Sequence, residues 1–138
     1  MSARLDLSPD EEQELARLLA ELTTSLGREQ SLGAMLRGWD ELVGRIERGY
    51  GDSIYEYTDD LSVRDRLERV VEGAGSALRA KLQARLDESD RRFEAATEES
   101  ARPLAKSRDP RAPWWDRVPV RRIGELAGDL ESLGYVRR

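Results

Sequence analysis

The stretch Ser31-Leu-Gly-Ala-Met-Leu-Arg-Gly-Trp-Asp-Glu-Leu-Val-Gly-Arg-Ile46 sets the architecture of this chain. Its large apolar residues recur at spacings of three and four, so a helix starting after Ser31 carries them on one face and is the best candidate for a central helix. That face comprises Leu32, Met35, Leu36, Trp39, Leu42, Val43 and Ile46. Gly33, Gly38 and Gly44 each cost up to about 1 kcal/mol relative to Ala in a helix interior, so packing must outweigh propensity.

A helix is also expected on the N-terminal side of this stretch. Ser8 is a suitable N-cap, Pro9 fits the first helical position, and the acids that follow face the positive end of the helix dipole. Gly27 predicts an end at about Leu26. The apolar stripe of this helix consists of Leu15, Leu18, Leu19, Leu22 and Leu26.

On the C-terminal side, Gly49-Tyr-Gly51 ends the central helix, and residues 52–61 follow with a mixed pattern. Ile54, Tyr57 and Leu61 fit one face of a short helix, although the local alternation also fits a strand. Because no partner strand is evident, the helix is favoured.

The residues after this segment fall out of phase with it, and Ser62-Val-Arg-Asp65 has the form of a capping box. We therefore expect the helix to break at Ser62 and to restart. Gly73-Ala-Gly75 stops the restarted helix, and Ser76 begins a long one. The apolar positions of the long helix are Leu78, Leu82, Leu86, Phe93 and Ala96.

Prolines dominate the next region, because residues 100–121 contain Pro103, Pro110, Pro113 and Pro119. They forbid a continuous helix and predict an extended strap over the surface. A last helix is expected from about Arg121 to Leu133, with Gly134 as its stop signal. Its expected apolar face is Ile123, Leu126, Leu130 and Leu133.

These elements predict an all-α fold, a single-domain bundle of about five helices with a long strap containing Pro and Trp before the last helix. One helical domain is expected to span residues 1–138, because this length can bury one core but is short for two. Residues 1–7 are expected to be flexible.

The amino-acid composition excludes most common types of catalytic site. With no Cys and no His, the chain cannot build Ser-His-Asp or Cys-His sites or zinc-thiolate centres. We therefore expect no enzyme activity, no catalytic residue, no cofactor and no metal. Apolar runs are too short for a membrane span and no signal peptide is evident, so a cytoplasmic location is expected.

Charge is unevenly distributed along the chain. Residues 1–60 carry 14 acidic and 6 basic side chains, a net charge of −8, whereas residues 100–138 carry 5 and 9, a net charge of +4. Such asymmetry can steer a charged partner, or it can reflect complementarity between the two ends of one fold.

The first candidate contact surface is the segment from Tyr50 to Asp60, which combines three of the four tyrosines with four carboxylates. Tyrosines give contact area at a small entropic cost, and clustered acids attract a basic partner. Two alternatives remain: the tyrosines belong to the core beside a solvated acidic face, or the carboxylates bind a hard cation such as magnesium. The predicted contact residues are Tyr50, Asp52, Tyr55, Glu56, Tyr57, Asp59 and Asp60.

The second candidate surface is the basic segment 102–122, in which Trp114 and Trp115 lie among arginines that include Arg117. Interleaved basic and aromatic residues suit a nucleic-acid backbone and stacked bases. The alternative is that one or both tryptophans anchor the strap on the helices while the arginines neutralise the acidic half. Since neighbours on an extended chain point in opposite directions, one Trp could pack while the other meets a partner.

The leading hypothesis is a small acidic helical protein that binds and occludes a protein partner, as immunity proteins, antitoxins and other inhibitors do. The partner would be basic, such as a toxin or nuclease. One alternative is a nucleic-acid-binding regulator that uses segment 102–122, and another is a carboxylate-metal-dependent hydrolase. No membrane partner is expected, and the sequence leaves the oligomeric state open, including a homodimer.

Overall fold

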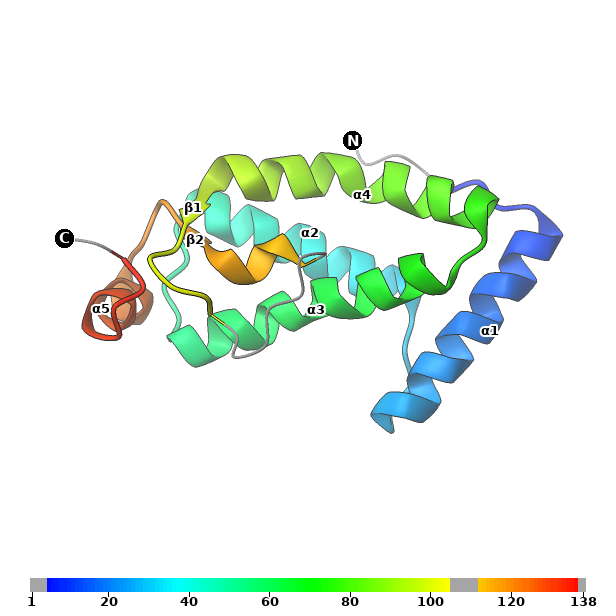
Figure 1. Ribbon diagram of the computed structural model, residues 1–138, viewed down its shortest axis with the longest axis horizontal. Coiled ribbons are helices and arrows are strands. Elements are labelled where there is room, and N and C mark those ends of the chain that lie inside the picture. Colours follow the sequence, from blue (N-terminus) through cyan, green and yellow to red (C-terminus); the bar gives the residue numbers. More distant parts are fainter. Residues whose placement is uncertain (1–4, 105–111, 137–138) are drawn as a thin grey trace.

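The computed structural model describes residues 5–104 and 112–136 and confirms the all-α fold. Helices α2, α3 and α4 lie side by side, α1 leans across one end of them, and α5 crosses the other end (Figure 1). The helices are α1 (Pro9–Leu26), α2 (Leu32–Arg48), α3 (Ile54–Gly73), α4 (Ser76–Ala96) and α5 (Gly124–Ser132). The predicted strap holds the strand β2 (Arg117–Pro119) and the 3-10 turn η1 (Pro113–Asp116), and the strand β1 (Thr97–Glu99) lies just before it.

Helix α1 begins and ends where the sequence predicts. The Ser8 hydroxyl accepts from the Glu11 backbone N–H at 3.2 Å, and the Glu11 carboxylate accepts from the Ser8 N–H at 2.8 Å, which completes a capping box. Gly27 ends the helix at a φ of 73°, a left-handed conformation that favours glycine. Of the predicted stripe, only Leu18 and Leu22 are buried, because α1 covers just one end of the bundle.

The expected break at Ser62 is wrong, because α3 runs without interruption from Ile54 to Gly73. The Ser62 hydroxyl donates to the Asp59 carbonyl oxygen at 2.5 Å within the helix instead of capping a new one. The phase shift has another cause: α3 packs against different partners along its length. Its first half contacts α5 and its second half contacts α1. Because these two helices lie on different sides of α3, the two halves carry their apolar residues on different faces.

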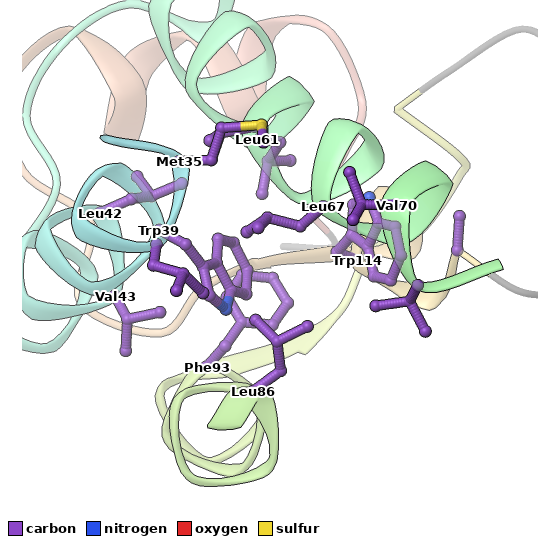
Figure 2. Close-up of a cluster of buried hydrophobic side chains, with 14 of the residues drawn as sticks. Met35, Trp39, Leu42, Val43, Leu61, Leu67, Val70, Leu86, Phe93 and Trp114 are labelled. Carbon is purple, nitrogen blue, oxygen red and sulfur yellow. The ribbon is translucent and has the colours of Figure 1, made fainter. Parts of the chain in front are cut away.

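The core is one cluster centred on α2 and α3. Every residue of the predicted apolar face of α2 is buried, and the main contacts of α2 are with α3 and α4. Helix α3 packs against all four other helices, so it is the hub of the bundle. In Figure 2, Trp39 lies against Phe93 and Leu86 of α4, and Trp114 lies beside α3 near Val70.

The strap is more structured than an extended chain. Strand β2 pairs with β1 in antiparallel register, with Thr97 opposite Pro119 and Glu99 opposite Arg117. The sequence did not predict this short ladder, which has only three pairs and no alternating apolar pattern. Residues 105–111 of the strap lie outside the described part of the chain.

At the other end of the chain, residues 1–4 of the expected flexible stretch are also not described. Leu5 and Leu7 pack against the core, and Lys81 Nζ donates to the Asp6 carbonyl oxygen at 2.7 Å. Among the described residues, no helix is long and apolar enough to cross a membrane.

Helix α5 is shorter than predicted, because it begins at Gly124. Leu126 and Leu130 are fully buried as expected, but Ile123 and Leu133 are 55% and 42% exposed, which corrects the predicted apolar face. The Gly124 backbone has a φ of 56° and passes against the loop before α3. There the Glu125 N–H donates to the Gly51 carbonyl oxygen at 3.0 Å, which fixes α5 on that loop.

Gly124→Ala should destabilise the protein by about 1–3 kcal/mol, because the left-handed conformation is strained for Ala and the new methyl group would approach a backbone oxygen. A methyl carbon with ideal geometry at this position would lie 2.7 Å from the Gly51 carbonyl oxygen. Urea unfolding followed by circular dichroism measures the effect.

Gly128→Ala, within the same helix, is the matched control. No atom lies within 4 Å of its Cβ position, so it should raise stability by up to about 1 kcal/mol through helix propensity alone. Equal effects of the two substitutions would contradict the close approach of α5 to Gly51.

Candidate functional site

The segment from Tyr50 to Asp60 begins as a loop and continues as the first two turns of α3. Ser53 caps the helix by accepting from the Glu56 N–H at 3.2 Å. From the other side, the Ile54 N–H donates to the Asp129 carboxylate of α5 at 2.9 Å. The first turn of α3 is therefore held both by its own cap and by the last helix.

Two of the predicted contact residues, Tyr50 and Tyr57, are core residues. Both are fully buried, and their rings meet edge to face with centroids 5.2 Å apart. Tyr50 donates its hydroxyl to Asp60 at 2.6 Å, and Tyr57 donates to the Arg117 carbonyl oxygen at 2.9 Å. A partner cannot touch these side chains in this conformation, so the core alternative holds for them.

Burial also changes the chemistry of these two phenols. Desolvation raises the pKa of Tyr50, and the hydrogen bond to the Asp60 carboxylate raises it further. The pKa of Tyr57 is raised chiefly by burial and then by the neighbouring Tyr50. Both groups therefore remain neutral hydrogen-bond donors.

Tyr55 has the opposite environment. Its side chain is 78% exposed, the largest value among the exposed large hydrophobic residues of the described chain. Asp59, four positions along the helix, is exposed on the same side as Tyr55, and Glu56 is exposed at the next position of the sequence. The outward face of this part of α3 therefore presents an aromatic ring next to acids.

The carboxylates of this face are close to one another. One oxygen from each of Glu56, Asp59 and Asp60 lies within 4.8 Å of the others. Arg45 of α2 binds Asp60 at 3.4 Å and Asp52 at 2.6 Å, and the Asp52 hydrogen bond raises the pKa of Arg45. Asp52 does not join the trio, so the structure brings together three of the four predicted carboxylates.

This trio is a weak candidate for a metal site. Asp60 already accepts hydrogen bonds from Tyr50 and Arg45, so only Glu56 and Asp59 are left among the three without an ion pair to a described residue. No other group of three or more such ligands occurs in the described residues. The metal-hydrolase alternative gains no further support from this geometry.

The two tryptophans of the strap are anchors. Trp114 is buried, Trp115 is half-buried, and both indole N–H groups donate to the Asp65 carboxylate of α3, at 2.7 Å and 2.9 Å. The expectation that neighbours point apart fails because η1 is a 3-10 turn and not an extended chain. The sequence pattern predicts that Asp65 belongs to a helix cap. In the structure, Asp65 instead binds the strap to α3 through the two indole groups.

Arg64 is a second residue that the sequence pattern does not single out. It is only 2% exposed, it stacks on Trp114 at 4.6 Å from the ring centroid, and it pairs with Asp90 of α4 through two bonds of 3.0 and 2.8 Å. Burial alone would lower the pKa of Arg64, but Asp90 and Glu68 outweigh burial and raise it. The sequence indicates the burial of Arg64 only through its position, because Arg64 lies three residues after Leu61 on the buried face of α3.

Three of the described arginines of the strap bind neighbouring parts of the chain, whereas Arg121 is exposed and makes no hydrogen bond or ion pair with a described residue. Arg117 donates to the Thr97 hydroxyl at 2.7 Å and to backbone carbonyls, and Arg102 donates to the Leu133 carbonyl oxygen. Arg122 pairs with Glu98 of β1. These groups are engaged within the fold, which weakens the nucleic-acid alternative, although Lys106, Arg108 and Arg111 lie outside the described residues.

A groove of about 520 Å³ runs beside the acidic face, between α2, α3 and the loop before α2. Its lining includes Asp59 and Asp60 on one side and the apolar Met35, Leu42 and Val63. Arg66 also lines it, with a buried Nε that has no acceptor among the described residues. Burial lowers the pKa of Arg66. The exposed face of α3 thus continues into a concave surface.

Asp65→Asn should loosen the strap, because one amide oxygen cannot accept as the two carboxylate oxygens do and the new N–H₂ group opposes the indole donors. We expect a loss of about 1–3 kcal/mol of stability and a red shift of tryptophan emission. Denaturant unfolding and fluorescence test this, with Asp87→Asn on the exposed face of α4 as the control. Unchanged emission in Asp65→Asn would contradict the shared anchor.

Alkaline pH should destabilise the protein through Tyr50 and Tyr57. Their raised pKa values mean that the unfolded chain releases the phenolic protons first, so the contribution of these two groups to stability is constant below about pH 10 and falls above it. Phenolate absorbance and circular dichroism, recorded together, should show these two groups ionising only as helicity is lost. Tyr50→Phe/Tyr57→Phe should remove most of the pH dependence; reversible ionisation of every tyrosine in the folded protein would contradict this assignment.

Comparisons with known proteins assign this chain to no family. No protein-family model, no curated protein and no solved structure matches it. A proposed function for this chain therefore rests on the geometry of its own side chains.

Proposed function

We propose that this protein is a small non-catalytic inhibitor that binds and occludes a basic protein partner, as immunity proteins and antitoxins do. The contact surface is the acidic face of α3, which we define as Tyr55, Glu56 and Asp59 with Asp60 at its edge. Tyr50 and Tyr57 support this face from within the fold.

The observation that carries the proposal is the exposure of Tyr55 next to acids that form no ion pair with a described residue. A tyrosine that is 78% exposed contributes little to folding, but it loses a large area of contact with water when a partner covers it. Tyrosine has few rotatable bonds, so ordering it costs little entropy. Tyr55 is suited to be the anchor of the interface.

The charges around Tyr55 favour a basic partner. Three carboxylates whose oxygens lie within 4.8 Å of one another repel; Arg45 pairs with Asp60, and Arg66 attracts Asp59 without forming an ion pair with it. A lysine or arginine of the partner, placed beside Glu56 and Asp59, would relieve this repulsion. The overall charge of −5 adds attraction at long range, so association should be fast and should weaken with salt.

The fold makes the face rigid enough for this purpose. Ser53 and Asp129 bind the first backbone N–H groups of α3, and the two buried tyrosines fill the space beneath. A preorganised surface loses little conformational entropy on binding. The adjacent groove between α2 and α3 offers space for a side chain or loop of the partner.

Tyr55→Ala combined with Asp59→Lys should reduce partner capture by at least about tenfold, because it removes the anchor and reverses one charge of the face. Affinity capture from the source lysate, quantified by mass spectrometry at low and high salt, measures the loss. Asp60 is left unchanged because its bonds to Tyr50 and Arg45 belong to the fold.

Asp87→Lys is the matched control, since it makes the same charge change on an exposed position of α4. It should capture the partner as the unsubstituted protein does. If both variants captured the same proteins to the same extent, the acidic face of α3 would not be the binding surface.

A further inference from the structure

Two arginines in the lining of the groove between α2 and α3 form no ion pair with a described residue, namely Arg28 and Arg66. Arg45, the third arginine of the lining, is bound to Asp52 and Asp60. Arg28 is exposed on the loop before α2, and Arg66 is half-buried on α3. Two of the three positive charges of this groove therefore lack a carboxylate in direct contact.

The guanidinium of Arg66 is held in one orientation but is only partly used. Its Nη1 donates to the Ser62 hydroxyl at 3.1 Å. Its Nε is buried without an acceptor, and its Nη2 makes no hydrogen bond with a described residue either. An unpaired buried donor is unfavourable, so native proteins generally give such a group a hydrogen-bond partner.

Nε and Nη2 form the edge of a guanidinium that binds two oxygens at once. Two other arginines of this chain use this edge. Arg64 binds both carboxylate oxygens of Asp90 through these nitrogens at 3.0 and 2.8 Å, and Arg92 binds both oxygens of Glu47 in the same way. The same edge of Arg66 is suited to an anion with two or more oxygens.

The two carboxylates that attract Arg66 along α3 do not bind it. Asp65 accepts from both indole groups of the strap, and Asp59 forms no ion pair with Arg66. From the loop before α2, Arg28 repels Arg66: burial lowers the pKa of Arg66, and the charge of Arg28 lowers it further. An anion between the two arginines would replace this repulsion with two attractions.

Arg66 lies toward the end of the groove at which α2 begins. Arg45 binds Asp60, and a Cβ atom on Gly38 would lie 3.6 Å from Val63, so α2 and α3 run in opposite directions along the groove. The first turn of α2 contains no acid. The positive end of its helix dipole therefore adds to the attraction for an anion at this end.

The acids of the lining limit the size of the anion. The lining contains four acids and three arginines, so the groove as a whole does not attract a polyanion such as nucleic acid. One small anion can still bind, because hydrogen bonds to a guanidinium edge are local. Since Arg66 and Arg28 come from different elements, a tetrahedral anion can serve both, whereas a carboxylate uses its two oxygens on one edge. The acids are Glu29, Glu41, Asp59 and Asp60.

We propose that Arg66 and Arg28 together bind one phosphate group, either as inorganic phosphate or as the end of a small phosphomonoester. Nε and Nη2 of Arg66 would donate to two of its oxygens, and Arg28 would donate to a third. This site goes beyond the proposed function, because neither arginine belongs to the acidic face of α3 and no protein partner takes part.

Titration of the isotope-labelled protein with inorganic phosphate, followed by NMR, tests the proposal. The Nε–H resonance of Arg66 should move in a saturable way, because this group gains an acceptor. A dissociation constant of about 1 mM is expected for so small a ligand. Sodium chloride keeps the ionic strength constant, so charge screening does not change during the titration. Phenyl phosphate distinguishes the two sources: tighter binding than that of inorganic phosphate identifies a phosphomonoester, and equal or weaker binding identifies the free ion.

Arg66→Lys keeps the charge but removes the edge formed by Nε and Nη2, so it should weaken phosphate binding by at least about tenfold. Backbone amide shifts in the loop before α2 report binding in this variant. Arg91→Lys, at an exposed position of α4 outside the lining, is the matched control and should bind phosphate as the unsubstituted protein does. Arg28→Gln should weaken binding by about fivefold, as expected for loss of an exposed charge pair.

The proposal is overturned if phosphate gives no saturable shift up to about 20 mM, far above the expected dissociation constant. It is also overturned if acetate binds as tightly as phosphate, or if Arg66→Lys and Arg91→Lys bind phosphate equally well. Arg28 is exposed and forms no ion pair with a described residue, so Arg28→Gln does not perturb the fold. An unchanged affinity in Arg28→Gln would likewise contradict the proposal.

Discussion

The buried positive charge of Arg64, in the middle of α3, is the point at which four elements of the fold meet. Removing a guanidinium from water is expensive unless carboxylates pair with it in good geometry. Asp90 supplies two parallel hydrogen bonds and Glu68 a third. Because Asp90 also accepts from Trp39, and Trp114 stacks on Arg64, this charge ties α2, α3, α4 and η1 to a single point.

Helix α3 has two parts with different roles, one around Arg64 and one nearer its start. Around Arg64 and Asp65 the helix is covered by the strap, and its polar groups serve the fold. Nearer its start, buried side chains such as Tyr57 turn inward while Tyr55 and Glu56 remain exposed. A helix that is anchored firmly at its centre can present a fixed surface at its first turns, which is what a binding face requires.

Charge neutralisation inside the fold differs from what the sequence suggested. The acidic first half of the chain is met mainly by α4, through Lys81 with Glu11, Arg85 with Asp40 and Arg92 with Glu47. Of the described strap arginines, Arg102, Arg117 and Arg122 instead bind backbone carbonyls, Thr97 and Glu98, and Arg121 is exposed. The acids at the start of α3 are therefore not neutralised by the described strap arginines, and this surplus of negative charge supports the proposal of a basic partner.

The helices, their caps and most of the core follow from the amino-acid sequence alone, because periodicity and capping are local properties of the chain. The absence of Cys and His likewise limits the chemistry without any knowledge of the fold. Long-range packing, in contrast, settles which tyrosines are buried, that α3 is continuous past Ser62, and that Trp114 and Trp115 share Asp65. The shared anchor joins residues about 50 positions apart in the chain, and local spacing carries no information about which distant group a side chain will meet.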